Sequence, residues 1–142
     1  MRNGRLLQML SVATAVFGLA VGAAQAELLK LTAQLGGQNE VPPNDSAGSG
    51  SAEATLDTQT GVLTYSIVFE GLTGPVIGAH LHGPSDEGGN AGIVVPFETR
   101  ESPIEGSAQL SPVQITEVAQ GLTYVNIHTG QHPGGELRGQ LR

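Results

Sequence analysis

The chain has 142 residues and a formal net charge of −7, from 13 acidic residues against 6 basic ones, and it contains no cysteine. The scattered acidic residues leave no basic surface for nucleic acid and argue against anionic membranes as partners. The lack of cysteine excludes disulfides, thiolate metal ligands and thiol nucleophiles. The length suits one domain that buries its own core.

The first 26 residues have the three parts of an export signal. Arg2 and Arg5 provide a positive start, an apolar run follows, and Ala24–Ala26 is a small-x-small cleavage site. The apolar run is short for a membrane-spanning helix, which needs about 20 residues. We therefore expect a signal peptide over residues 1–26, and a periplasmic or secreted domain over residues 27–142 with no membrane anchor. The cleaved domain keeps four basic residues against 13 acidic ones, a net charge of −9.

Alternating apolar and polar residues, separated by Gly- and Pro-rich turns, predict many short strands in the domain. In chain order the predicted strands are residues 29–35, 51–56, 62–70, 76–82, 93–97, 106–110, 122–128 and 135–141. One helical turn is predicted over residues 113–120, ended by Gly121. Eight short strands with almost no helix indicate an all-β fold, an antiparallel Greek-key sandwich or barrel.

All four histidines lie in two short segments of the chain: His80 and His82 in one, and His128 and His132 in the other. Successive side chains of a strand point to opposite faces, so His80 and His82 share a face, about 6–7 Å apart at their Cα atoms. His128 belongs to a second predicted strand, and His132 to the loop that follows. If the two strands are neighbours, the histidines converge on one point.

The same alternation assigns the neighbouring side chains to two faces of the sheet. Residues predicted to point toward the core are Ile77, Ala79, Leu81, Val125 and Ile127, whereas Tyr124, Asn126 and His128 point to the opposite face with His80 and His82.

A cluster of imidazoles favours a transition metal. Imidazole nitrogen suits zinc and also copper, which stands above zinc in the affinity order. Calcium and magnesium prefer oxygen ligands. We therefore predict a copper site, with zinc as the alternative, made by His80, His82 and His128 with His132 as a possible fourth ligand. Such a site should weaken below about pH 6.5, where free imidazoles protonate. The competing interpretation is that the histidines are ordinary surface residues or hydrogen-bond a loop.

Arg138 lies on the polar face of the last predicted strand, with Glu136 and Gln140. Its guanidinium either lies beside the histidines, where it binds an anion or orients a ligand, or forms an ion pair with Glu136 or Glu40 that ties down the strand. The sequence favours the ion pair.

No arrangement of catalytic residues stands out in the sequence. There is no Gly-x-Ser-x-Gly elbow, and the glycine-rich segment of residues 88–92 has neither the lysine nor the helix of a phosphate loop. The acids are scattered, so no pair of carboxylates is assigned as acid and base. An enzyme is therefore not the favoured interpretation.

Four motifs of the chain, in order, resemble the CHRD domain, a family named for its occurrence in chordin and also found alone in many exported bacterial proteins. They are Asn39–Pro43, Ala79–Gly83, Tyr124–Thr129 and Gly134–Leu141. The resemblance runs from about residue 29 to residue 141, nearly the whole predicted domain. It implies an all-β extracytoplasmic domain.

The same resemblance places His80, His82 and His128 on motif positions and His132 on a more variable one. The His-x-His strand is also similar to the copper-binding strand of copper/zinc superoxide dismutases, another Greek-key β fold. The cysteines of the dismutase pattern and its histidine- and aspartate-rich zinc loop are absent here. That second likeness therefore does not imply dismutase activity.

Three functions follow from these patterns. The leading one is an exported module that binds copper, or zinc, for storage, transport or sensing. The second is a metal-free adhesion domain that contacts another extracytoplasmic protein, and the third is a copper-dependent, dismutase-like redox enzyme. In each case the residues expected to support the site or the fold are Glu40, Asn126, Glu136 and Arg138.

Overall fold

The computed structural model describes residues 27–142, so the predicted export signal lies outside the described residues. The elements, in order, are β1 (Leu28–Gly36), η1 (Gly37–Asn39), β2 (Ser49–Asp57), β3 (Val62–Glu70), β4 (Val76–His82), β5 (Ile93–Pro96), β6 (Ile104–Gln109), α1 (Pro112–Ala119), β7 (Thr123–Thr129) and β8 (Leu137–Leu141).

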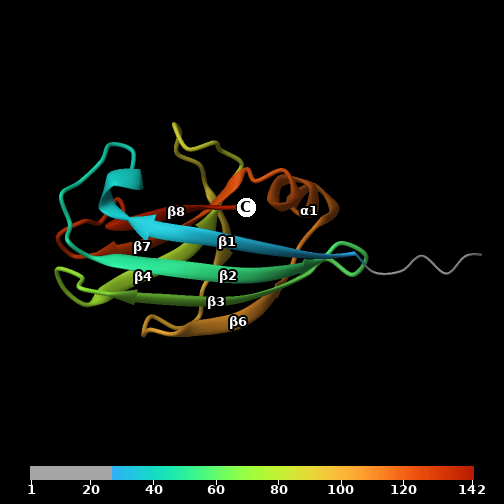
Figure 1. Ribbon diagram of the computed structural model, residues 1–142, viewed down its shortest axis with the longest axis horizontal. Coiled ribbons are helices and arrows are strands. Elements are labelled where there is room, and N and C mark those ends of the chain that lie inside the picture. The colour runs from blue at the N-terminus through green and yellow to red at the C-terminus, as the bar shows by residue number, and fades with distance from the viewer. Residues whose placement is uncertain (1–26) are drawn as a thin grey trace, which may run out of the picture.

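The eight strands form one antiparallel sheet in the order β5-β4-β7-β8-β1-β2-β3-β6. The sheet curls into a nearly closed barrel, with α1 near one end and the loops after β1, β3 and β7 at the other (Figure 1). This confirms the predicted all-β fold of about eight strands. The adjacency of β4 and β7 matters most for the site, because these are the two strands that carry histidines.

The barrel is filled by the apolar side chains that alternate along the strands. The predicted core positions Ala79, Leu81, Val125 and Ile127 are buried, and Leu137 and Leu141 of β8 join them. Burial of these side chains is the main source of stability, at about 1.5–3 kcal/mol for a fully buried Leu or Ile.

Local capping interactions set the two ends of helix α1. Ser111 caps its start, because the Ser111 hydroxyl accepts from the Gln114 amide and the Gln114 side chain accepts from the Ser111 amide. Gly121, with a φ of 71°, follows the last turn. Val118 is fully buried in the core cluster, which anchors the helix to the barrel.

One predicted core residue is wrong. Ile77 is 49% exposed. The register of β4 against β7 shifts between Val76 and Gly78, which face Thr129 and His128, so Ile77 is the extra residue of a β-bulge. A bulge breaks the strict alternation of faces, and the side chain turns outward.

Several element boundaries also differ from the prediction. β2 begins at Ser49, inside the predicted loop, because Ser49 and Gly50 pair with Glu70 and Phe69. β6 begins at Ile104, two residues early, and Gly135 and Glu136 precede β8 instead of belonging to it.

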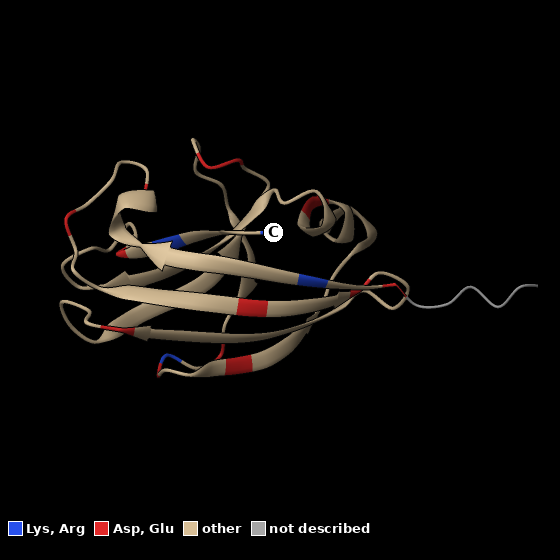
Figure 2. Ribbon diagram, in the orientation of Figure 1, with Lys and Arg blue, Asp and Glu red and all other residues tan. Residues whose placement is uncertain are grey.

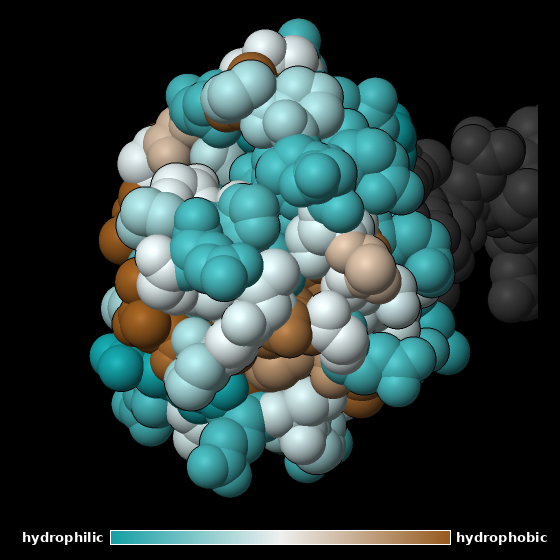
Figure 3. Space-filling view, turned by 90° about the vertical axis from the view of Figure 1, so that its left-hand side faces the viewer, coloured by the Kyte–Doolittle hydropathy of each residue, from teal (hydrophilic) through white to brown (hydrophobic). Residues whose placement is uncertain are grey.

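The surface is acidic without a single acidic patch. Figure 2 shows the Asp and Glu residues spread over loops and strand faces, with few basic residues among them. Viewed onto the end formed by the loops after β1, β3 and β7, the surface is mostly hydrophilic, with apolar patches to one side and near the centre (Figure 3). The scattered charge agrees with the expectation from sequence.

Candidate metal centre

The outer face of the paired strands β4 and β7 brings three histidines together. Gly78 lies opposite His128, and His80 lies opposite Asn126. One nitrogen from each of His80, His82 and His128 lies within 4.8 Å of the other two. The predicted convergence is therefore confirmed for these three residues. His132 is outside the group; its backbone exchanges hydrogen bonds with Thr129 in the loop after β7.

Two of the imidazoles are oriented by backbone carbonyls. His82 Nδ1 lies 2.9 Å from the Ala91 carbonyl oxygen, and His128 Nδ1 lies 3.1 Å from that of Pro133. A carbonyl can only accept, so both Nδ1 atoms carry the proton and both Nε2 atoms present lone pairs. His82 Nε2 is buried and has no hydrogen-bond partner. A donor nitrogen held by its other ring N–H is typical of metal-binding histidines.

His80 completes the group in a different way. Its Nδ1 lies 3.1 Å from His128 Nε2. Because His128 Nε2 carries a lone pair and no proton, His80 Nδ1 donates this hydrogen bond in the metal-free protein. Use of His80 Nδ1 as a ligand requires the proton to move to Nε2. Gly78 leaves room for this ring, since a Cβ there would lie 3.0 Å from His80 Cε1. The sequence offered no signal for this role of Gly78.

Burial keeps the three imidazoles neutral. It lowers the pKa of His80 to about 4, and the neighbouring His128, His82 and Arg100 add to the effect. Burial also lowers the pKa of His82 and of His128, against the opposing effect of their bonds to Ala91 and Pro133. Neutral imidazole is the form that binds a metal ion.

The sequence motifs agree with a comparison against protein families. The sequence model of the CHRD domain matches residues 31–141, nearly all of the described chain. The protein belongs to the CHRD family. This is an extracellular-type domain, and no solved structure matches the chain. Within residues 27–142, no helix is long and apolar enough to cross a membrane.

A stack of side chains supports the histidines of this CHRD domain. The ring of Tyr124 lies parallel to that of His82, at 5.1 Å between centroids. The Arg138 guanidinium carbon lies 3.6 Å from the Tyr124 ring centroid. The Tyr124 hydroxyl accepts a hydrogen bond from the Ala91 amide at 3.0 Å. Tyr124 and His82 thus both hydrogen-bond to the backbone of Ala91. The sequence placed Tyr124 on this face, but only the pairing of strands shows its contact with His82.

The ion pair predicted for Arg138 is wrong. Its guanidinium donates to the Asn90 side-chain oxygen at 3.1 Å and to the Asp86 carbonyl at 2.8 Å. The ion pair found among the described residues joins Arg142 to Glu87 instead. The two acids proposed as partners of Arg138 hydrogen-bond to other side chains.

Glu136 is one of those acids, and it is fully buried. Its carboxylate accepts hydrogen bonds from the hydroxyls of Ser46, Thr73 and Thr129, and from the Thr73 amide. Burial alone would raise the pKa of Glu136, but these bonds outweigh it and lower the pKa to about 2. Glu136 therefore ties three segments of the loop end of the barrel together.

Glu40 is the second acid, and it pairs with Asn126. The Asn126 amide donates to Glu40 Oε1 at 2.5 Å and to the Leu137 carbonyl at 2.9 Å. Burial raises the pKa of Glu40 to about 7, although Asn126 and Arg138 act in the opposite direction. Glu40, Asn126, Glu136 and Arg138 thus all lie outside the group of three histidines.

Proposed function

We propose that this CHRD domain is an exported metal-binding module that holds one copper ion through His80, His82 and His128, with zinc as the alternative. The observation that carries the proposal is the buried lone pair of His82 Nε2. It has no partner of its own, and it belongs to a group of three imidazole nitrogens within 4.8 Å. A buried acceptor without a partner costs about 1–3 kcal/mol, which a metal ion would recover.

The spacing of the nitrogens fits an imidazole-ligated ion after small movements. Bonds of about 2.0–2.1 Å place two ligand nitrogens about 3.3–3.6 Å apart. His80 Nδ1 and His128 Nε2 are already 3.1 Å apart, and all three ligand nitrogens of the group lie within 4.8 Å of one another. The group has no carboxylate, which favours copper or zinc over calcium and magnesium.

The role we propose is storage, transport or sensing of the ion outside the cytoplasm. The membership of an extracellular-type family supports this location, as does the export pattern of residues 1–26. In a cell that expresses the full chain, the exported protein should begin at Glu27, which N-terminal sequencing of the periplasmic or secreted fraction would test.

Titration calorimetry of the metal-free protein with Cu(II) and with Zn(II) tests the site. We expect one saturable site that is lost in the double variant His80→Ala/His82→Ala. His132→Ala is the matched control, since His132 lies outside the group, and it should keep the affinity of the wild type. Absence of saturable binding, or unchanged binding in the double variant, would overturn the proposal.

A structural role of the histidines is the second candidate, in a metal-free interaction domain. It is favoured by the bond between His80 and His128 and by the bonds of His82 and His128 to backbone carbonyls. In that case the histidine variants lower the melting temperature in the presence of chelator, and copper or zinc does not change the melting temperature of the wild type.

A further inference from the structure

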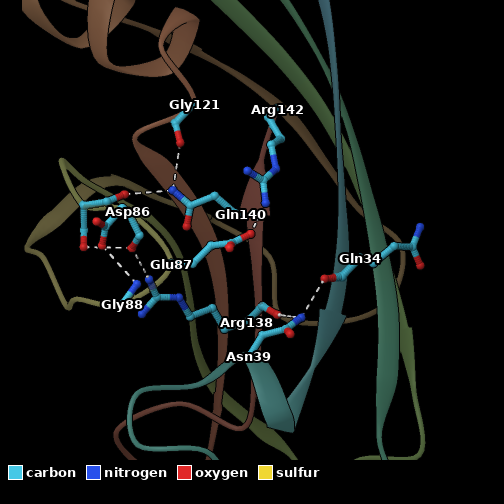
Figure 4. A network of polar contacts seen from close by, with 10 residues as sticks. Gln34, Asn39, Asp86, Glu87, Gly88, Gly121, Arg138, Gln140 and Arg142 are labelled. Carbon is cyan, nitrogen blue, oxygen red and sulfur yellow. Dashed lines mark hydrogen bonds and ion pairs between the residues drawn. The ribbon is translucent and has the colours of Figure 1, made fainter.

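A groove of about 730 Å³ lies on the outer face of the sheet, apart from the three histidines. Its floor includes Gln34 of β1 and the alternate residues of β8, and its walls are the segment around η1 and the loop between β4 and β5 (Figure 4). This volume is within the range of small-molecule sites, about 300–1,000 Å³. The lining is rich in amide and guanidinium groups.

The first sign of a ligand is the charge on the groove floor. Arg138 and Arg142 lie two positions on either side of Gln140, so all three side chains are on one face. Arg138 is only 1% exposed, and its guanidinium donates hydrogen bonds to a neutral amide and a backbone carbonyl. Among the described residues, the one carboxyl that acts on it electrostatically, Glu40, also lines the groove, and burial raises the pKa of Glu40 to about 7, so Glu40 balances the charge of Arg138 only in part. A buried cation is ordinarily balanced by an anion, so the floor is suited to a negative group.

The second sign is an unused acceptor between the two arginines. The Gln140 amide nitrogen donates to the carbonyls of Ser85 and Gly121, both at 2.8 Å. Its Oε1 atom is buried and has no hydrogen-bond partner. A hydroxyl donor of a ligand would satisfy this atom after a small movement of the side chains that cover it. Gln38 is a further exposed amide of the lining.

The third sign is a carboxylate of the protein that already lies in the groove. Glu87 reaches from the β4–β5 loop and forms an ion pair with Arg142 (Figure 4). The two side chains are 66% and 64% exposed, and an exposed pair of this kind contributes little to stability. The Glu87 carboxylate therefore indicates where a ligand carboxylate could bind Arg142, and a ligand could displace Glu87 from this weak ion pair.

We propose that the groove binds a hydroxyl-rich small molecule with one carboxylate, the chemical class of sugar acids, and that the carboxylate of this ligand replaces Glu87 on Arg142. The guanidinium groups account for the preference for an acid over a neutral sugar. The amides and the free Gln140 oxygen account for the preference for hydroxyls over a simple carboxylate. The inference does not depend on the proposed metal site, because neither Glu87 nor Arg142 belongs to the histidine group.

The experiment is a calorimetric titration of the exported domain with glucuronate, and with glucose and acetate in parallel. We expect saturable binding of glucuronate and binding of glucose and acetate at least about tenfold weaker. Glu87→Gln removes the internal competitor and should strengthen glucuronate binding about three- to fivefold. Arg142→Gln should weaken it about tenfold.

Glu101→Gln and Arg100→Gln are the matched controls, since both residues are exposed and lie outside the groove. They should leave glucuronate binding unchanged, and Glu87→Gln, Arg142→Gln and Glu101→Gln should titrate with copper as the wild type does. No saturable binding in both the wild type and Glu87→Gln would overturn the proposal. Equal affinity for glucose would contradict the role of the arginines, and equal affinity for acetate would contradict the class of sugar acid.

Discussion

His82 lies flat against Tyr124, with 7° between the ring planes and 5.1 Å between the ring centroids. On the other side of the contact, Arg138 lies over Tyr124. The stack joins the histidine group to the groove, because Arg138 is also part of the groove floor. The rigid ring of Tyr124 thus fixes the plane of His82, while the Ala91 carbonyl fixes its Nδ1.

Removal of this stack should weaken metal binding while the three ligands remain. In Tyr124→Leu we expect copper affinity to fall about 10- to 100-fold, the usual effect of losing a group that orients a ligand. Tyr124→Phe keeps the ring and loses only the hydrogen bonds of the hydroxyl with the Ala91 backbone, one from the amide and one to the carbonyl, so its affinity should lie closer to the wild type. Competition titrations with a copper chelator measure both. Equal loss in the two variants would show that the hydroxyl matters and the stack does not.

Metal binding should persist at lower pH than the sequence suggests. Free imidazoles would lose the ion below about pH 6.5, but burial lowers the pKa of all three histidines, and that of His80 to about 4. Protons therefore compete less with the metal between pH 6.5 and 5. Copper affinity measured across pH 4–8 should fall steeply only in the lower part of this range. A midpoint near 6.5 would contradict the burial of the group.

Glu136→Gln should destabilise the domain at neutral pH. The pKa of Glu136 is lowered from 4.5 to about 2, so its ionised form stabilises the folded state above pH 4.5, and this contribution disappears as the pH falls toward 2. The shift corresponds to about 3 kcal/mol at pH 7. Urea unfolding of the wild type and the variant at several pH values should show a difference that shrinks with acid. Glu105→Gln, at an exposed residue of β6, should change stability by less than about 0.5 kcal/mol.

Gly135→Ala should be costly, and its neighbour provides the control. Gly135 has a φ of 133°, and a Cβ there would lie 2.5 Å from Glu40 Oε1 and 2.6 Å from the Asn126 amide nitrogen. We expect a loss of at least about 2 kcal/mol, from backbone strain and from displacement of the Glu40–Asn126 pair. Gly134→Ala meets nothing within 4 Å and should change little. Similar thermal melting of both variants would contradict this account.

The strands and their faces were predictable because they depend on local alternation. His80 and His82 share a face for the same reason that Ala79 and Leu81 share the core, namely the two-residue repeat of an extended chain. The prediction failed at Ile77, where the bulge depends on how β4 pairs with β7, which no local pattern records.

The partners of the polar side chains were less predictable. Charge alone suggested an ion pair between Arg138 and Glu136 or Glu40. In the fold, Glu136 is satisfied by three hydroxyls and one amide, and the guanidinium meets Asn90 and Asp86 of the β4–β5 loop. Long-range contacts of loops are set by how the barrel closes, so opposite charge in the sequence is a weak guide to them.

By itself, the sequence determined the all-β class, the family, the absence of thiolate ligands and the three histidines of the candidate centre. Only the tertiary structure decided that β4 and β7 are neighbours, that His132 stays outside the group, and that Tyr124 lies between His82 and Arg138. The physical reason is that residue type and alternation act over a few positions of the chain. The distance between His80 and His128, 48 positions apart, depends instead on the packing of the whole barrel.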